Sequence, residues 1–230
     1  MQTKTKPVLW SEAAYLLGLL ILAWGTAWME RANFGMSMVV APAYLVHLKL
    51  SRLWPWFTFG VAEYLLQAVL LLLLAAVQRK FKKAYLFSFV TAVLYGILLD
   101  GVLALTALLP GEGTAARVVY YLAGLVLCSV GVALLFYTYL PPEAYELVVK
   151  ELAQTYSIPL ARCKTTYDCV SCLVGVLLSF AFFGFGRFEG VKLGTVFCAL
   201  INGSIIGWCS RQLQNRVQMK DALPLRNRFR

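Results

Sequence analysis

Charged residues are scarce in this sequence, where Asp, Glu, Lys and Arg together account for 14% of 230 residues. Histidine occurs once, at His47, so a zinc site built from cysteine and histidine is not expected. The chain also lacks the Gly-Lys-Ser/Thr phosphate loop, the His-Glu-x-x-His zinc motif and the Gly-x-Ser-x-Gly nucleophile motif. We therefore predict that the protein is not an enzyme and that it needs neither a metal nor a cofactor.

Hydrophobic residues dominate the rest of the sequence, since they make up 60% of the chain and the mean hydropathy is +0.72. A helix needs about 20 mostly apolar residues to cross a bilayer. Six stretches meet this requirement, at residues 11–30, 58–78, 84–108, 117–138, 166–185 and 191–209. The first is too long for a cleavable signal peptide, and we expect it to remain as an anchor. The composition therefore predicts an all-α membrane protein with six transmembrane helices.

The basic residues predict the orientation of these spans. With a cytoplasmic N-terminus, fifteen of the 21 Lys and Arg residues fall on the cytoplasmic side. The six on the outer side are Arg31, Lys49, Arg52, Arg117, Arg187 and Lys192. Because basic loops stay in the cytoplasm, both termini are predicted to be cytoplasmic. The net charge of +10 is then a topology signal that favours contact with the lipid bilayer, and nucleic-acid binding is not expected.

Part of the first half recurs about 105 residues later, with an odd number of spans in each copy. Residues 25–27 (Gly-Thr-Ala) correspond to residues 131–133 (Gly-Val-Ala), and residues 58–64 correspond to residues 163–169. An odd number of spans turns the second copy upside down relative to the first. The pattern predicts two inverted three-helix repeats. The division is residues 1–109, residues 110–212 and a basic cytoplasmic tail at 213–230.

Each repeat contains a long linker between its first and second spans, at residues 36–50 and 142–157. In the second linker the apolar residues fall on one helical face, with Glu146, Lys150 and Glu151 opposite them. Such a linker can lie flat in the membrane interface or dip back into the membrane as a re-entrant segment. The sequence leaves both arrangements open.

Four polar residues within the apolar stretches are the strongest candidates for function. Glu63 and Asp168 occupy matching positions in the two repeats, Asp100 lies in the third span, and Asn202 interrupts the sixth. A carboxylate in hydrocarbon is costly and usually faces a protein interior or a wet cavity. We predict that these four line a pathway, where the alternative is that they brace helix ends or bond neighbouring helices.

Smaller residues complete the predicted site and the packing around it. Pro42 and the pair Pro141-Pro142 stand at corresponding places in the two linkers and favour broken elements that line a cavity. Ser37 and Thr195 are expected to be polar wall residues beside these broken elements. Glycines at intervals of four residues let helices approach closely and are assigned to helix packing. They are Gly186, Gly190, Gly194, Gly203 and Gly207.

The six cysteines all lie in the second half, and Cys169 and Cys172 have the spacing of a dithiol motif. That motif normally opens a helix in a thioredoxin-like fold, for which the sequence gives no sign. We interpret the pair as apolar packing, with redox chemistry or metal binding as the alternatives.

Residues 25–27 and residues 32–37 (Ala-Asn-Phe-Gly-Met-Ser) resemble the Gly-x-Ala…Ala-x-Leu-Gly-x-Ser stretch of the bacterial YczE/YyaS/YitT-like integral membrane proteins. Further matches follow in order at residues 57–60, 96–100 and 190–203, so that the resemblance covers residues 14–210. It implies a multi-pass protein of the bacterial plasma membrane, in a group for which transport or export has been suggested.

Two segments depart from the pattern of that group. Met38-Val39-Val40 stands where many relatives have Pro-Trp-Asp, and Pro141-Pro142-Glu143 stands where a Gly-Pro-Arg-Asp-like turn is common. A ligand-binding role for these two loops is therefore not carried over to this chain.

These observations favour secondary transport or export of a small organic molecule, coupled to protons or another cation. Inverted repeats underlie many secondary transporters, whose substrate sites lie near the midplane where the halves meet. The alternative is a non-transporting membrane partner or regulatory protein that acts through helix–helix contacts. A homodimer is compatible with either function.

Overall fold

The computed structural model describes residues 7–35, 37–106, 108, 113–224 and 226. This part of the chain is almost entirely helical, and six of its helices are long and apolar enough to cross a membrane. They are α1 (Ser11–Ala32), α3 (Phe59–Gln78), α4 (Lys83–Thr106), α5 (Thr114–Tyr137), α7 (Leu160–Phe183) and α8 (Leu193–Arg216). The six predicted spans are confirmed as helices, and they indicate a multi-pass integral membrane protein.

The helices extend beyond the predicted spans mainly where polar residues prolong them. α7 begins at Leu160 and not at residue 166, and α8 continues to Arg216 and not to residue 209. Hydropathy detects only the apolar part of a helix, whereas the backbone hydrogen bonds continue through polar residues at its ends. The first turns of α7 therefore carry side chains that precede the predicted span at residues 166–185.

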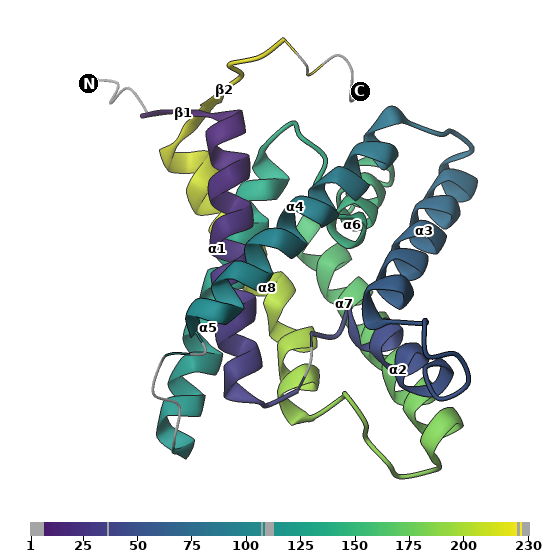
Figure 1. The fold of residues 1–230 in the computed structure, drawn as a ribbon. Helices are drawn as coiled ribbons and strands as arrows, with labels where there is room; N and C mark the ends of the chain where they lie inside the picture. Colours follow the sequence, from purple (N-terminus) through teal and green to yellow (C-terminus); the bar gives the residue numbers. More distant parts are fainter. Residues whose placement is uncertain (1–6, 36, 107, 109–112, 225, 227–230) are drawn as a thin grey trace.

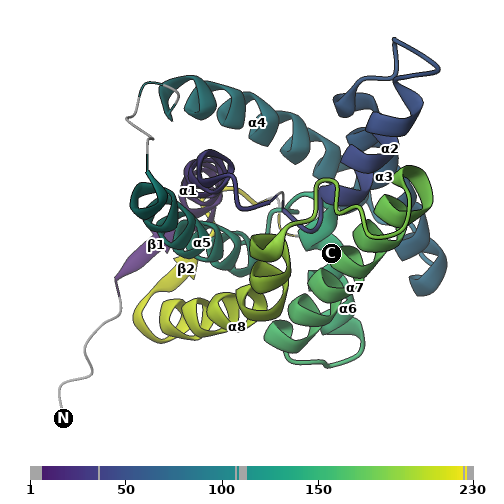
Figure 2. The ribbon, with the colours of Figure 1, turned by 90° about the horizontal axis from the view of Figure 1, so that it is seen from below.

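The centre of the fold is an antiparallel pair formed by α1 and α5, with α4 beside α1 and α8 beside α5 (Figures 1 and 2). Glycines bring the two central helices close together. A Cβ added at Gly25 would lie 2.8 Å from the carbonyl oxygen of Gly124, and one added at Gly131 would lie 2.8 Å from that of Gly18. Such contacts are possible only without side chains at these positions.

The other four helices, α2 (Ala41–Leu50), α3, α6 (Ala144–Thr155) and α7, lie to one side of this pair (Figure 1). Two of them, the short helices α2 and α6, are formed by the linkers. α2 packs against α3 and α7 at one end of the bundle, and α6 packs against the same two helices toward the other end. α3 and α7 are thus joined through both linkers.

The carboxylates on the polar face of α6 are buried against neighbouring helices. Glu146 is 7% exposed and Glu151 is 8% exposed. Each carboxylate is matched by an ammonium group, because Glu146 pairs with Lys164 and Glu151 pairs with Lys82. Pairing lowers the cost of burying these charges, so α6 can be enclosed on both faces.

Hydroxyl groups of α4 fix the entry to α6. Ser88 donates a hydrogen bond to the carbonyl oxygen of Pro142 at 2.7 Å, and Thr91 donates one to that of Pro141 at 2.8 Å. Tyr15 of α1 bonds the same Thr91 hydroxyl at 2.6 Å. The pair Pro141-Pro142, which follows α5 and precedes α6, is therefore held in place by side chains of α4 and, through Thr91, of α1.

A small feature not predicted from the sequence joins the two ends of the chain. Strand β1 (Val8–Trp10) pairs in parallel with β2 (Gln218–Lys220), so both ends of the described chain lie on the same side of the bundle (Figure 1). Glu12 accepts hydrogen bonds from the backbone N–H groups of Ala222 and Leu223 at 3.0 and 2.9 Å. The segment after α8, expected only as a basic tail, is thus held against the start of α1.

Candidate functional site

An ion-pair network of α6 and α7 forms the centre of the candidate site. The ammonium nitrogen of Lys164 lies 3.1 Å from Glu146 Oε1 and 2.9 Å from Asp168 Oδ1. Lys164 is 1% exposed and Asp168 is fully buried. Because the two residues are four positions apart on α7, they share one face of the helix. The ring of Tyr167 adds a cation–π contact, with its centroid 5.7 Å from the ammonium.

Amide and hydroxyl groups extend this network to two further helices. Asn202 of α8 donates its side-chain N–H to Asp168 Oδ2 at 3.4 Å. The hydroxyl of Ser129 on α5 lies 3.1 Å from Asn202 Oδ1. Ser129 is fully buried, and Asn202 is 7% exposed. The charged centre is therefore linked to both helices of the α5–α8 pair.

α3 contributes Glu63 and Gln67 to the site, where Glu63 contacts both Gln67 and Tyr145 of α6. The hydroxyl of Tyr145 donates to Glu63 Oε1 at 2.7 Å, and the amide of Gln67 donates to the same oxygen at 3.4 Å. Thr58 caps the start of α3, since its hydroxyl accepts from the backbone N–H of Val61 at 3.3 Å. This cap places Glu63 in the second turn, where it faces α6.

Several acceptor oxygens near Glu63 lack a donor. Glu63 Oε2, Gln67 Oε1 and Glu143 Oε1 are buried and have no hydrogen-bond partner among the described residues. Glu143 precedes the first turn of α6 and is 7% exposed. Burial, together with the nearby carboxylates Glu146 and Glu63, raises the pKa of the Glu143 carboxyl well above its usual range. This carboxyl therefore favours its protonated form, which supplies a hydrogen-bond donor.

The site contains more acid than base. Four carboxyl groups lie in or beside the network, those of Glu63, Glu143, Glu146 and Asp168, and the ammonium of Lys164 pairs with the last two. Carboxylates away from water are stable only if a proton or a cation neutralises them. Within the described residues, no three His, Cys, Asp or Glu side chains are grouped so as to hold a metal ion. A carboxyl group in such surroundings can exchange a proton or pair with a cation.

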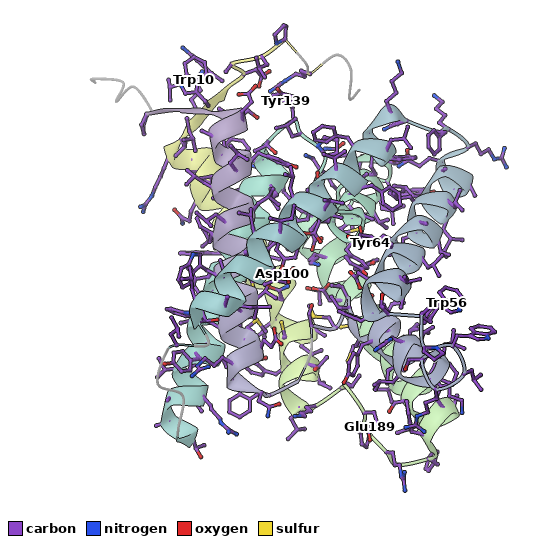
Figure 3. All side chains as sticks on the ribbon, viewed as in Figure 1. Trp10, Trp56, Tyr64, Asp100, Tyr139 and Glu189 are labelled. Atoms are coloured by element: carbon purple, nitrogen blue, oxygen red, sulfur yellow. The ribbon has the colours of Figure 1, made fainter. Side chains whose placement is uncertain are left out.

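The predicted site residues are only partly brought together. Glu63, Asp168 and Asn202 meet around α6. Asp100 is exposed on α4, midway between the two ends of the bundle (Figure 3), and is not part of the cluster. Its helix presents this side outward because the opposite side of α4 packs on α1.

Ser37 and Thr195 also lie away from the cluster. Thr195 stands at the start of α8, where its hydroxyl accepts a hydrogen bond from the backbone N–H of Lys192 at 3.3 Å. Seven residues of helix separate it from Asn202, a rise of about 10 Å. Ser37 is partly buried before α2, where its carbonyl oxygen accepts from the backbone N–H of Ala41 at 3.0 Å. Both residues organise the end of the bundle opposite the chain termini.

The glycines assigned to packing divide into two groups. An added Cβ at Gly203 would lie 2.3 Å from the Thr165 hydroxyl, and one at Gly207 would lie 2.5 Å from Ala161 Cβ. Gly194 is as close to Phe34. In contrast, Gly186 and Gly190 lie in the turn before α8 with positive φ angles, and Gly186 has no atom within 4 Å of an added Cβ. Backbone conformation explains these two glycines better than helix packing does.

The cysteines of the dithiol-like motif are part of the packed interior. All six cysteines are free thiols. Cys172 is buried in an apolar cluster with Met38 and Val191. The Cys169 thiol lies 3.7 Å from the carbonyl oxygen of Ala199. These surroundings favour the packing interpretation.

Sequence reasoning missed Lys164, Glu143 and Tyr145 as parts of the site. It counted Lys164 among the cytoplasmic basic residues that set topology, although the side chain is buried in ion pairs. The available signal was the spacing of Lys164 and Asp168, since opposite charges four residues apart at the start of an apolar helix can form a buried pair.

Comparison with known protein families gives a match over most of the chain. A family described as a family of unknown function, DUF6198, matches residues 9–211. No curated protein and no solved structure matches the chain. The match spans all six membrane helices except the last residues of α8.

Proposed function

The chain belongs to the DUF6198 family of unknown function, and we propose that it is a secondary transporter or exporter of a small organic molecule, coupled to protons or another cation. The observation that carries this proposal is the excess of carboxyl groups over ammonium groups in the network between α3, α6, α7 and α8, where Lys164 pairs with two of the four acids. Ionisable groups inside a membrane protein are costly and usually mark a substrate, ion or proton pathway. In this proposal the acids exchange a proton or bind a cation as the substrate moves.

Contacts between the helices support the proposed inverted repeats. The proposed repeats match α1, α2, α3 and α4 with α5, α6, α7 and α8, in that order. The contact of α1 with α4 then corresponds to that of α5 with α8, and the contact of α2 with α3 corresponds to that of α6 with α7. The contact of α3 with α6 corresponds to that of α7 with α2. The glycine contacts of the central pair follow the same relation. Gly18 approaches Gly131 and Gly25 approaches Gly124, and each of these pairs maps onto the other when the halves are exchanged. Alternating access would then be a rocking of one repeat against the other.

The proposed location is the bacterial plasma membrane, with both termini in the cytoplasm. The distribution of basic residues supports this orientation, even with Lys164 removed from the cytoplasmic group. The ordered matches at residues 25–37, 57–60 and 190–203 support kinship with the YczE/YyaS/YitT-like proteins. The absence of nucleotide-binding and hydrolytic motifs from the sequence supports a protein that is neither an ATPase nor an enzyme.

One observation favours the second candidate function, a membrane partner or regulatory protein. Asp100 is exposed on an otherwise apolar side of α4, next to Gly101, and an added Cβ at Gly96 or Gly101 would meet no atom within 4 Å. A helix of another protein, or of a second copy in a homodimer, could approach here and cover the carboxylate. Crosslinking from a cysteine introduced at Gly96 would detect such a partner.

A thermal-stability screen of the purified protein against metabolites, cations and antibiotics tests the transport proposal. A ligand present at 100 times its dissociation constant stabilises the folded state by about 2.7 kcal/mol, which is readily measured as a rise in melting temperature. We expect a stabilising ligand whose effect disappears in Glu63→Gln and in Asp168→Asn. Asp100→Asn is the matched control, because this acid also lies within a span but outside the cluster, and it should keep the full effect. A ligand that stabilises all three variants equally would bind elsewhere and would contradict the assignment of the site.

A further inference from the structure

A pocket separate from the acid-rich cluster opens at the end of the bundle that carries both chain termini. It has a volume of about 300 Å³ and lies between the end of α5, α6 and the segment after β2. Its polar lining comes from Tyr137, Tyr139, Lys150, Gln154 and Arg226, together with Glu151. Figure 3 shows Tyr139 at this end, opposite Glu189 at the other. If the basic loops are cytoplasmic, the pocket lies at the level of the cytoplasmic headgroups.

Within the described part of the chain, Lys150 is the charged lining residue that forms no ion pair. Its ammonium donates to the carbonyl oxygen of Thr138 at 2.7 Å, and among the described residues no carboxylate lies within 4.0 Å of it. Glu151, the acid that follows Lys150 in the sequence, pairs with Lys82. Burial lowers the pKa of the Lys150 ammonium to about 8, with nearby Arg226 contributing in the same direction and Glu151 opposing it. An anion in the pocket would stabilise a positive charge at this position.

Arg226 provides a second cation at the rim. Its guanidinium pairs with Asp221 at 2.6 Å and lies over the ring of Tyr139, 5.8 Å from the centroid. Nearly half of its side chain is exposed, so the remaining N–H groups are free to reach a ligand above the pocket. Lys150 of α6 and the more exposed Arg226 therefore line the same pocket from two different segments of the chain.

We propose that this pocket binds a phosphate group, held by the Lys150 ammonium and the Arg226 guanidinium. Ammonium and guanidinium groups are the usual protein ligands of phosphate, the first as a point charge and the second through its planar fork. The phosphate can belong to an anionic lipid headgroup, which is abundant at this depth in a cytoplasmic leaflet, or to a free anion. The site is independent of the transport proposal, because none of its residues belongs to the acid-rich cluster.

The test uses the full chain purified in a neutral detergent, titrated in parallel with phosphatidylglycerol and with inorganic phosphate while the melting temperature is followed. Stabilisation by phosphatidylglycerol alone identifies the lipid as the source, and stabilisation by inorganic phosphate identifies the free anion. For whichever titrant acts, we expect Lys150→Gln to weaken the apparent affinity about tenfold and Arg226→Gln to weaken it several-fold. Lys80→Gln is the matched control, since it removes an exposed charge from the same side of the protein, and it should change the affinity less than twofold.

The effect of pH separates a ligand-binding role of Lys150 from a purely structural one as a donor to Thr138. Raising the pH from 7 to 9 deprotonates the Lys150 amine, so wild-type binding of phosphatidylglycerol should fall. In Lys150→Arg the charge persists over this range, and binding should stay constant. If Lys150→Gln does not fold, Arg226→Gln and this pH comparison decide the question. The proposal is overturned if neither titrant stabilises the protein, or if the variants respond as the wild type does.

Discussion

Lys164→Met should destabilise the protein by about 3–5 kcal/mol, the largest effect that we expect for a single substitution. Among the residues that the structure describes, Lys164 is the only cation that pairs with two buried carboxylates, Glu146 at 3.1 Å and Asp168 at 2.9 Å. Methionine is unbranched and only one atom shorter than lysine, so packing changes little, but both acids lose their counterion away from water. Chemical unfolding of the purified protein, followed by circular dichroism, measures the loss.

Two variants separate the loss of charge pairing from a general effect of the substitution. Lys83→Met removes an exposed lysine at the start of α4 and should change the free energy of unfolding by less than about 0.5 kcal/mol. Adding Glu146→Gln and Asp168→Asn to Lys164→Met removes the unpaired charges and should restore most of the stability, because neutral replacements of buried ion pairs are often tolerated. A triple variant as unstable as Lys164→Met would show that packing, and not charge, governs this region.

Gly25→Leu should separate the central helices and destabilise the fold by about 3 kcal/mol, the upper part of the range for overpacked cores. The added Cβ alone would lie 2.6 Å from the backbone nitrogen of Cys128 and 2.8 Å from the carbonyl oxygen of Gly124. Backbone atoms cannot turn aside as a flexible side chain can, so α1 and α5 must move apart along their contact. A fall in melting temperature of the purified variant is the readout.

Gly96→Leu is the matched control for this experiment, because it makes the same substitution inside another membrane helix. No atom lies within 4 Å of an added Cβ at Gly96, and leucine favours the helix over glycine by up to about 1 kcal/mol. The melting temperature should therefore stay the same or rise. If Gly25→Leu were also tolerated, α1 and α5 would not be packed as closely as the structure shows.

The sequence was sufficient to predict the six helices because each depends on a local property. Long apolar stretches specify membrane helices regardless of their neighbours, and the predicted starts of α1, α3 and α4 lie within one residue of those observed. Prediction failed at the polar ends. α7 starts six residues before its predicted start because its first turns contain polar residues that hydropathy leaves out. Lys164 in these turns is paired with Glu146 of α6, a contact that no local pattern contains.

The candidate site was predictable only in part for the same reason. An acid in an apolar span is conspicuous, and this signal identified Glu63 and Asp168. It could not distinguish them from Asp100, since exposure on α4 depends on which side of that helix packs against α1. Glu143, Tyr145 and Glu146 lie in a linker of ordinary polarity, and they join the site because Ser88 and Thr91 anchor the preceding prolines and direct α6 into the bundle.

Uptake into proteoliposomes tests the central claim, that the acid-rich cluster drives transport, most directly. A ligand from the thermal screen would be offered to liposomes containing wild type, Glu63→Gln or Asp100→Asn, under a proton gradient, a sodium gradient or none. We predict that one gradient accelerates uptake by wild type and by Asp100→Asn, and that Glu63→Gln loses this acceleration while remaining folded. Uptake no faster than in protein-free liposomes, or full gradient dependence in Glu63→Gln, would contradict the account.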